Sequence, residues 1–251
     1  MEPTTTPTKT NSLAIPIAIV FGFGLIALAI YFSGIGANNN SNNQVAAVAT
    51  EKTKANIRAV DKTDYIFGNP NAPILVVEYS DYDCPFCKNF HETMNKIMNE
   101  YGVSGKVAWV YRQFPIAQLH PNAPKISEAA LCVGELGGND AFWKFSNSIF
   151  QERGVNEPTN MSKLVDFAVL AGVNKDDYQK CVDSGKHKKT IDDSLAEGAS
   201  AGIAGTPQSF VLVGNQQAQI EGAQPYPVVK QIIENLVGQL EGKVNTTGES
   251  N

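Results

Sequence analysis

The sequence has few residues that could hold a metal ion, with four cysteines and three histidines among 251 residues. Only Cys84 and Cys87 lie close together, while Cys132 and Cys181 stand alone and neither of these two is paired with a histidine at ligand spacing. A structural zinc site of the ribbon type needs a second close pair, so this pattern disfavours one. Basic residues are not clustered and the net charge is −5, which argues against a nucleic-acid surface.

Charged residues are missing altogether between Lys9 and Glu51. Within this gap, residues 13–32 form an unbroken apolar run, LAIPIAIVFGFGLIALAIYF. A helix rises about 1.5 Å per residue, so this run is long enough to cross the roughly 30 Å of bilayer hydrocarbon. We therefore predict a transmembrane anchor at residues 13–32, after a cytoplasmic tail of residues 1–12. A cleaved signal peptide is the alternative, but its apolar core is normally shorter, and the small-x-small site at residues 47–49 lies well past the run.

Composition also predicts where the folded part of the chain begins and ends. Residues 33–60 contain the low-complexity stretch GANNNSNNQ and no aromatic residue, so they have little to bury in return for becoming ordered. We predict a flexible linker there and a disordered tail at residues 242–251. Residues 61–241 are predicted to form one folded domain.

Hydrophobic patterns within this domain predict strands and helices in the order β-α-β, a helical block, then β-β-α. The predicted strands are residues 74–77, 107–114, 209–213 and 218–221. The predicted helices are residues 88–101, 124–136, 140–151, 161–171, 175–183, 187–201 and 226–240.

The motif CPFC, residues 84–87, falls where the first predicted strand gives way to its helix. A disulfide across so short a loop removes little chain entropy, which disfavours a purely structural role. At a helix start, the Cys84 sulfur would lie near unpaired N–H groups and the positive end of the helix dipole, and both favour its thiolate. Pro85 suits the first helical turn. Cys87, one turn later, would be more buried and placed to resolve a mixed disulfide, so the motif predicts redox chemistry.

The strand–CPFC–helix unit, the helical insertion and the Thr-Pro before a β-hairpin resemble the DsbA-like thiol-disulfide oxidoreductases, a branch of the thioredoxin superfamily. The resemblance covers residues 61–241. It implies an α/β thioredoxin-like fold, with a helical insertion at about residues 123–204 between the two halves. It also implies that Pro207 is cis and lies beside the cysteines, and that Thr206 offers its backbone to a substrate peptide in strand-like pairing.

The resemblance assigns roles to further residues. Glu78, six residues before the first cysteine, matches a buried acid that assists proton transfer from the resolving thiol, with Arg112 as its predicted partner. By strand alternation alone, Glu78 would instead face solvent. His120 matches a family position, although a structural histidine is the simpler interpretation. As in some relatives, Cys132 and Cys181 are predicted to form a structural disulfide, which would stabilise the domain by roughly 4 kcal/mol; a free buried pair is the alternative.

Phe86 departs from the pattern of the most oxidising DsbA enzymes, which have histidine at this position. A histidine there stabilises the thiolate in a way that phenylalanine does not, so we expect a milder oxidant. Thr206 also occurs in this position in reductases and isomerases, which leaves the direction of electron flow open.

Together these features predict a membrane-anchored oxidoreductase in the cytoplasmic membrane of a prokaryote, with its catalytic domain on the periplasmic or extracytoplasmic side. The expected partners are unfolded or cysteine-containing exported proteins and a membrane redox partner. We expect no soluble cofactor, no metal, and a monomer. A disulfide-forming oxidase is the favoured function. A reductase or isomerase of the same fold, or a peptide-binding chaperone-like module without turnover, is the alternative.

Overall fold

The computed structural model describes residues 55–247 of the chain, with side chains described to residue 242. The predicted cytoplasmic tail, the predicted anchor and the predicted linker up to residue 54 lie outside this range. Among the helices that are described, none combines the length and the apolar character that crossing a bilayer requires. The anchor therefore stays a prediction.

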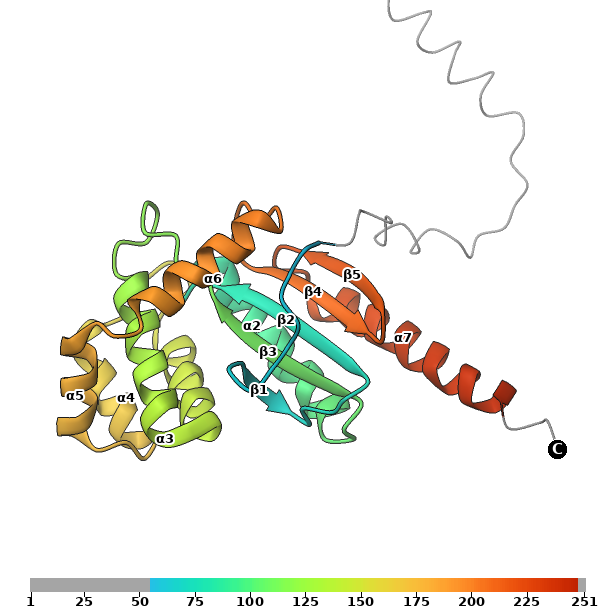
Figure 1. The fold of residues 1–251 in the computed structure, drawn as a ribbon, viewed down its shortest axis with the longest axis horizontal. Coiled ribbons are helices and arrows are strands. Elements are labelled where there is room, and N and C mark those ends of the chain that lie inside the picture. Colours follow the sequence, from blue (N-terminus) through green and yellow to red (C-terminus); the bar gives the residue numbers. More distant parts are fainter. Residues whose placement is uncertain (1–54, 248–251) are drawn as a thin grey trace, which may run out of the picture. The chain divides into compact units, whose positions relative to one another are not determined.

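A five-stranded sheet forms the centre of the described domain, with the strand order β1-β3-β2-β4-β5 (Figure 1). The strands are β1 (Tyr65–Gly68), β2 (Ile74–Ser80), β3 (Val107–Gln113), β4 (Gln208–Val213) and β5 (Gln216–Glu221). β2 and β3 are parallel, and the other neighbours are antiparallel. β3 is buried along its whole length and β2 nearly so, because apolar and β-branched residues fill both of their faces.

The helices are α2 (Pro85–Ile97), α3 (Ala123–Glu152), α4 (Leu164–Leu170), α5 (Lys175–Ser184), α6 (Lys188–Ser200) and α7 (Tyr226–Thr247). A π-helical turn at Met98–Gly102 extends α2, and a 3₁₀ turn at Met161–Lys163 precedes α4. Gly138, with a φ of 78°, interrupts α3 between the two helices that the sequence predicts there. α7 continues past its predicted end at Leu240, so the first residues of the predicted disordered tail are helical.

β1 is the strand that the sequence analysis missed. It is only four residues long and pairs with β3 at the edge of the sheet. So short a strand offers too few alternating positions to be recognised. Its place depends instead on contacts with distant residues: the ring of Tyr65 stacks on Phe142 of α3, with the ring centroids 3.9 Å apart.

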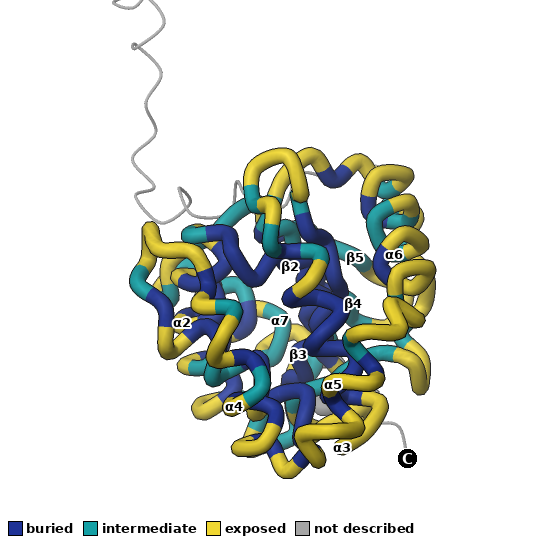
Figure 2. The backbone as a smooth tube through the Cα atoms, turned by 90° about the vertical axis from the view of Figure 1, so that its left-hand side faces the viewer, coloured by how far each residue is buried: buried dark blue, intermediate teal, exposed yellow. Residues whose placement is uncertain are grey.

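Successive strand residues alternate between two apolar layers, one on each face of the sheet. On one face, Val76 and Trp109 belong to a large core shared with α2, α3 and α7. On the other face, Val77, Val110 and Phe210 form a smaller core. Figure 2 shows the central strands buried, whereas α5 and α6 leave much of their surface exposed.

Residues 55–60, which the sequence analysis placed in the flexible linker, pack against the domain. The backbone N–H of Arg58 donates to Glu197 of α6 at 2.8 Å, and Arg112 of β3 donates to the carbonyls of Arg58 and Ala59 at 3.2 and 3.3 Å. These partners are distant in sequence, so composition gave no sign of them. The ordered domain thus includes the last residues of the predicted linker.

A disulfide ties two helices of the insertion together. Cys132 of α3 and Cys181 of α5 have their Sγ atoms 2.01 Å apart and are separated by 49 residues. The disulfide between Cys132 and Cys181 that the resemblance implied is therefore confirmed.

Candidate active site

The CPFC motif begins α2 directly after the loop that follows β2. Cys84 is the N-cap residue, with extended backbone angles, and Pro85 occupies the first helical turn. Both cysteines are free thiols in this structure. Cys84 is 4% exposed and Cys87 is 0% exposed, so the first sulfur has the easier access from solvent. Phe86 between them is 62% exposed and points away from the core.

The loop before β4 brings a second segment against the motif. The Thr206-Pro207 peptide bond is cis. The Cys84 thiol donates to the backbone carbonyl of Thr206 at 3.4 Å, although the two residues lie 122 positions apart. The segments meet because β4 pairs antiparallel with β2, with Gln208 opposite Tyr79 near the end of β2.

The pKa values of the two thiols are shifted in opposite directions. A hydrogen bond from the Cys87 thiol, together with the backbone amides of Cys87 and Phe86, lowers the pKa of Cys84 to about 6, against the opposing effect of burial. The amides point toward the sulfur at the helix start, but neither completes a full capping hydrogen bond. Burial, followed by the nearby Cys84, raises the pKa of Cys87 well above its ordinary value. At neutral pH, the pair thus offers one thiolate and one thiol.

Glu78 of β2 is fully buried beneath the cysteine pair. The indole N–H of Trp109 donates to its Oε2 at 2.9 Å, while Oε1 has no hydrogen-bond partner among the described residues. Burial raises the pKa of Glu78 to about 7. The charge of this carboxyl group also contributes to the raised pKa of Cys87, after burial and the neighbouring Cys84.

Arg112 is not the partner of Glu78, so that part of the prediction is wrong. In the parallel register of β2 and β3, Arg112 pairs with Tyr79, the residue after Glu78. Neighbouring strand residues point to opposite faces of a sheet, so the two side chains are separated by the sheet itself. Arg112 instead forms ion pairs with Asp64 at 3.0 Å and Glu197 at 2.8 Å, and with them it holds the N-terminal segment in place.

His120 is linked to the loop before the motif through Asp81. Its Nδ1 lies 2.9 Å from Oδ2 of Asp81. The same carboxylate accepts from the backbone N–H groups of Ile116 at 2.7 Å and Asp83 at 2.8 Å, and the N–H of Asp81 donates to Sγ of Cys87 at 3.4 Å. His120 therefore supports the loop between β2 and α2, in agreement with the simpler structural interpretation.

Arg153 and His91 are buried basic residues near the motif that the sequence analysis missed. Arg153, just after α3, is 3% exposed, and its Nη2 donates to the carbonyl oxygen of Cys84 at 2.5 Å. His91 lies one turn after Cys87, and its Nε2 is 2.6 Å from Oδ1 of Asn147. Burial lowers the pKa of His91 to about 4. Neither belongs to a local motif, since both contacts join residues far apart in sequence.

The surface next to the motif is hollowed and partly apolar. A cavity of about 280 Å³ lies beside Pro85 and His120 and includes Leu119 and Val155 in its wall. Leu119 is 68% exposed and Val155 41% exposed. Leu119 and Val155 thus expose apolar surface beside Pro85 of the motif, and Phe86 of the motif is itself exposed.

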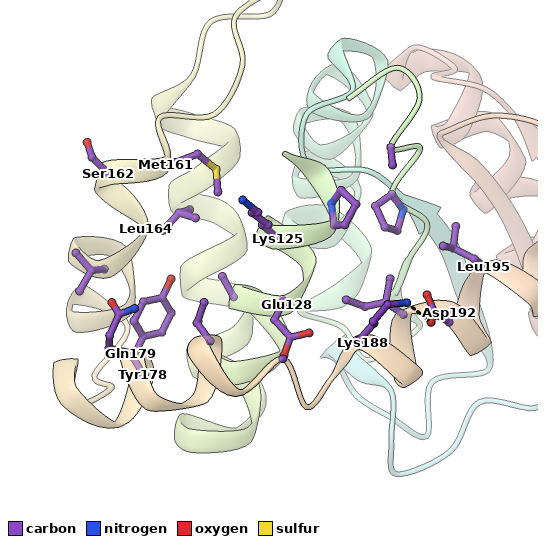
Figure 3. Close-up of a pocket in the computed structure, with 18 residues that line it drawn as sticks. Lys125, Glu128, Met161, Ser162, Leu164, Tyr178, Gln179, Lys188, Asp192 and Leu195 are labelled. Carbon is purple, nitrogen blue, oxygen red and sulfur yellow. Dashed lines mark hydrogen bonds and ion pairs between the residues drawn. The ribbon is translucent and has the colours of Figure 1, made fainter. Parts of the chain in front are cut away.

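A larger cavity of about 840 Å³ lies within the helical insertion, between α3, α4, α5 and α6 (Figure 3). Its wall combines apolar side chains such as Leu164 and Leu195 with the ion pair of Lys188 and Asp192. No residue of the CPFC motif or of the cis-proline loop lines it.

In the described part of the chain, one set of three potential metal ligands lies together. The ligand atoms of Cys132, Cys181 and His187 are within 4.8 Å of one another. Both sulfurs are already joined in the disulfide, so in this form the set cannot bind a metal ion as thiolates.

Three comparisons with known proteins point to one fold. A family model described as thioredoxin matches residues 60–235. A Rickettsia felis protein, provisionally named a protein-disulfide oxidoreductase, is 30% identical over 156 residues, covering 61% of this chain and 54% of that protein. The crystal structure of Wolbachia pipientis α-DsbA1 matches with a TM-score of 0.63 and 21% identity, covering 74% of this chain and 96% of that chain.

A match to a transporter covers only a small part of that protein. The Na⁺/H⁺ antiporter NhaA 1 of Mycolicibacterium gilvum is 29% identical over 161 residues, covering 62% of this chain but 24% of the antiporter. The chain thus spans about a quarter of this relative and about half of the Rickettsia protein. The similarity is therefore one of a shared domain, and neither name transfers a whole protein's activity to this chain.

Proposed function

Because the chain belongs to the thioredoxin family, we propose that it is a thiol–disulfide oxidoreductase that acts through Cys84 and Cys87, in the direction of disulfide formation. One observation carries this proposal. A thiol of lowered pKa and a buried thiol of raised pKa share the start of α2, and the first of them touches the carbonyl before a cis-proline. This arrangement suits exchange chemistry, because the thiolate is both the nucleophile and the better leaving group.

The proposed reaction begins with the Cys84–Cys87 disulfide. A substrate thiolate attacks Sγ of Cys84, a mixed disulfide forms, and Cys87 leaves and takes up a proton. Glu78 supplies that proton, since a pKa of about 7 keeps a share of its carboxyl groups protonated at neutral pH. A second substrate thiolate attacks the substrate sulfur of the mixed disulfide and releases Cys84 as a thiolate. The substrate loses two electrons and becomes a disulfide, while its protons end on Cys87, by way of Glu78, and in solvent.

The proposed direction of the reaction follows from which redox form of the cysteine pair, dithiol or disulfide, the site stabilises. A lowered pKa of Cys84 stabilises the dithiol form of the pair at neutral pH, and a stabilised dithiol form makes the disulfide form a stronger oxidant. This favours an oxidase. Reductases and isomerases of this fold run the same steps in the opposite sense or repeatedly on one substrate, and they remain the competing functions that the experiments below separate.

The substrates that suit this site are unfolded proteins with reduced cysteines. The Thr206 backbone lies next to the Cys84 sulfur, where an extended substrate segment would pair with it in the manner of an added strand. Phe86 of the motif is exposed, and Leu119 and Val155 expose apolar surface beside Pro85, which suits the apolar side chains of an unfolded chain. We place this activity on the extracytoplasmic side of a prokaryotic membrane, with residues 13–32 as the anchor, a monomeric protein and a membrane redox partner that reoxidises it.

The test uses the full-length oxidised protein and a reduced, unfolded substrate whose activity depends on its disulfides. We expect the substrate to regain activity with the loss of one enzyme disulfide per substrate disulfide formed. Cys84→Ser should abolish this. Cys87→Ser, incubated instead with the disulfide-bonded form of the substrate, should accumulate a mixed disulfide, because the Cys84 thiolate attacks the substrate disulfide and no second active-site thiol resolves the product. If Cys84→Ser protects the substrate from aggregation as well as the unmodified protein does, and the unmodified protein transfers no disulfide, the chaperone-like alternative holds and the proposal is wrong.

A further inference from the structure

Arg153 is a buried cation that contacts the backbone of the first active-site cysteine. Its Nη2 donates to the carbonyl oxygen of Cys84, and its Nη1 donates to the carbonyl of Glu157 at 3.1 Å, with longer contacts to those of Gly154 and Val155. These contacts anchor the guanidinium between the end of α3 and the start of α2. Its Nε has no hydrogen-bond partner among the described residues.

The two buried arginines of the described domain differ in their counter-charges. Arg112 and Arg153 are each 3% exposed. Arg112 forms two close carboxylate ion pairs, whereas the hydrogen bonds of Arg153 in the described part of the chain all go to carbonyl oxygens. A buried charge without a paired opposite charge is costly to the folded state, so this position of Arg153 requires an explanation.

The anions that can balance Arg153 lie in or next to the CPFC motif. Burial lowers the pKa of Arg153, and the nearby Asp83, Cys87, Cys84 and Asp81 oppose that effect. An arginine remains protonated at neutral pH even so. Asp83 already accepts the N–H of Thr159 at 2.8 Å, and the Asp81 carboxylate accepts backbone and histidine groups. The Cys84 thiolate is the one anion that the exchange reaction creates and removes.

We propose that Arg153 is a positioning residue that stabilises the Cys84 thiolate, supplying from the end of α3 the positive charge that a histidine between the cysteines would supply in place of Phe86. Its hydrogen bond to the Cys84 carbonyl fixes the N-cap residue, and its charge favours the ionised sulfur. This rests on the proposed function in one respect, namely that Cys84 is the exchanging thiol. It follows that Phe86 does not leave the thiolate without a cationic neighbour, and that the protein is a stronger oxidant than its CPFC motif alone implies.

The test measures the ionisation of Cys84 in reduced full-length protein by the ultraviolet absorbance of the thiolate. Arg153→Gln retains a donor for the Cys84 carbonyl but removes the charge, and Arg153→Lys retains the charge. Lys144→Gln, at an exposed position of α3, is the matched control for the loss of one positive charge. We expect Arg153→Gln to raise the pKa of Cys84 by about one, Arg153→Lys to restore at least half of that change, and Lys144→Gln to leave the pKa where it was.

The same variants predict a change in redox equilibrium. With glutathione at neutral pH, Arg153→Gln should weaken the protein as an oxidant by roughly fivefold, since less of the reduced pair is ionised. An unchanged pKa in Arg153→Gln would overturn the proposal, as would equal changes in the Gln and Lys variants, because charge would then have no part in the effect.

A measurement on the unsubstituted protein covers the case in which the variants do not fold. The nitrogen NMR signals of the Arg153 guanidinium should shift with the Cys84 titration and stay constant over the same pH range in Cys84→Ser. Signals that ignore the titration would overturn the proposal. The titration needs no substrate, so a protein that shows the Arg153 effect but transfers no disulfide would contradict the proposed function and not this inference.

Discussion

The buried carboxyl of Glu78 should destabilise the protein at neutral and alkaline pH. Burial moves its pKa from an ordinary 4.5 to about 7. Because the folded-state pKa is the higher one, the folded protein loses stability as the pH rises from about 4.5 through about 7, where the unfolded chain ionises first. Above this window the cost is about 3 kcal/mol, at about 1.4 kcal/mol for each tenfold change in proton affinity. Glu78→Gln removes the charge, keeps the size of the side chain, and keeps an oxygen to accept from Trp109.

The assay is denaturant unfolding of the oxidised protein at pH 4 and pH 8, so that neither active-site thiol titrates. We expect Glu78→Gln and the unmodified protein to unfold with similar free energies at pH 4, and the variant to be more stable by about 3 kcal/mol at pH 8. Glu92→Gln, on the exposed side of α2, is the control and should show no such pH dependence. A Glu78→Gln variant whose advantage does not grow with pH would refute the reasoning. The same variant should transfer disulfides more slowly, which would explain why so costly a group is present.

Three further substitutions test other parts of the account. Replacing both Cys132 and Cys181 by alanine should lower the free energy of unfolding by about 4 kcal/mol, because the bridge closes a long loop; urea unfolding measures this, and a loss below 1 kcal/mol would contradict it. Arg112→Met should lower the free energy of unfolding by about 3 kcal/mol, since it removes the buried ion pair with Asp64 and leaves that carboxylate with Arg58 as its remaining cation, yet the glutathione equilibrium of the folded variant should not move. Phe86→His should shift that equilibrium toward the dithiol form, and a shift toward the disulfide would count against the electrostatic argument.

The redox motif and its immediate neighbours were predictable because their geometry is local. A cysteine followed by proline at the end of a buried strand places Cys84 at a helix start, and the spacing alone puts Cys87 one turn later. The position of Pro207 was implied by family resemblance rather than by periodicity. The burial of Glu78 likewise came from the resemblance, since alternation alone would have exposed it.

The parts that the sequence did not reveal depend on contacts between distant residues. The register of β2 and β3 decides that Arg112 and Glu78 face opposite sides of the sheet, and no local pattern sets that register. Arg153 reaches Cys84 across 69 positions, through the packing of α3 against α2 and the sheet. Similarly, β1 and residues 55–60 are ordered by partners from elsewhere in the chain, so their own composition gave no signal.

The reduction potential of the Cys84–Cys87 pair in the full-length protein, measured by equilibration in glutathione buffers, tests the central claim most directly. A thiol of low pKa beside Arg153 and at the start of α2 should hold the potential in the range of about −120 to −180 mV that oxidases and isomerases occupy. The same experiment with Arg153→Gln should give a lower potential. A value near −270 mV, that of thioredoxin, would contradict the account and make this protein a reductase that requires an electron donor.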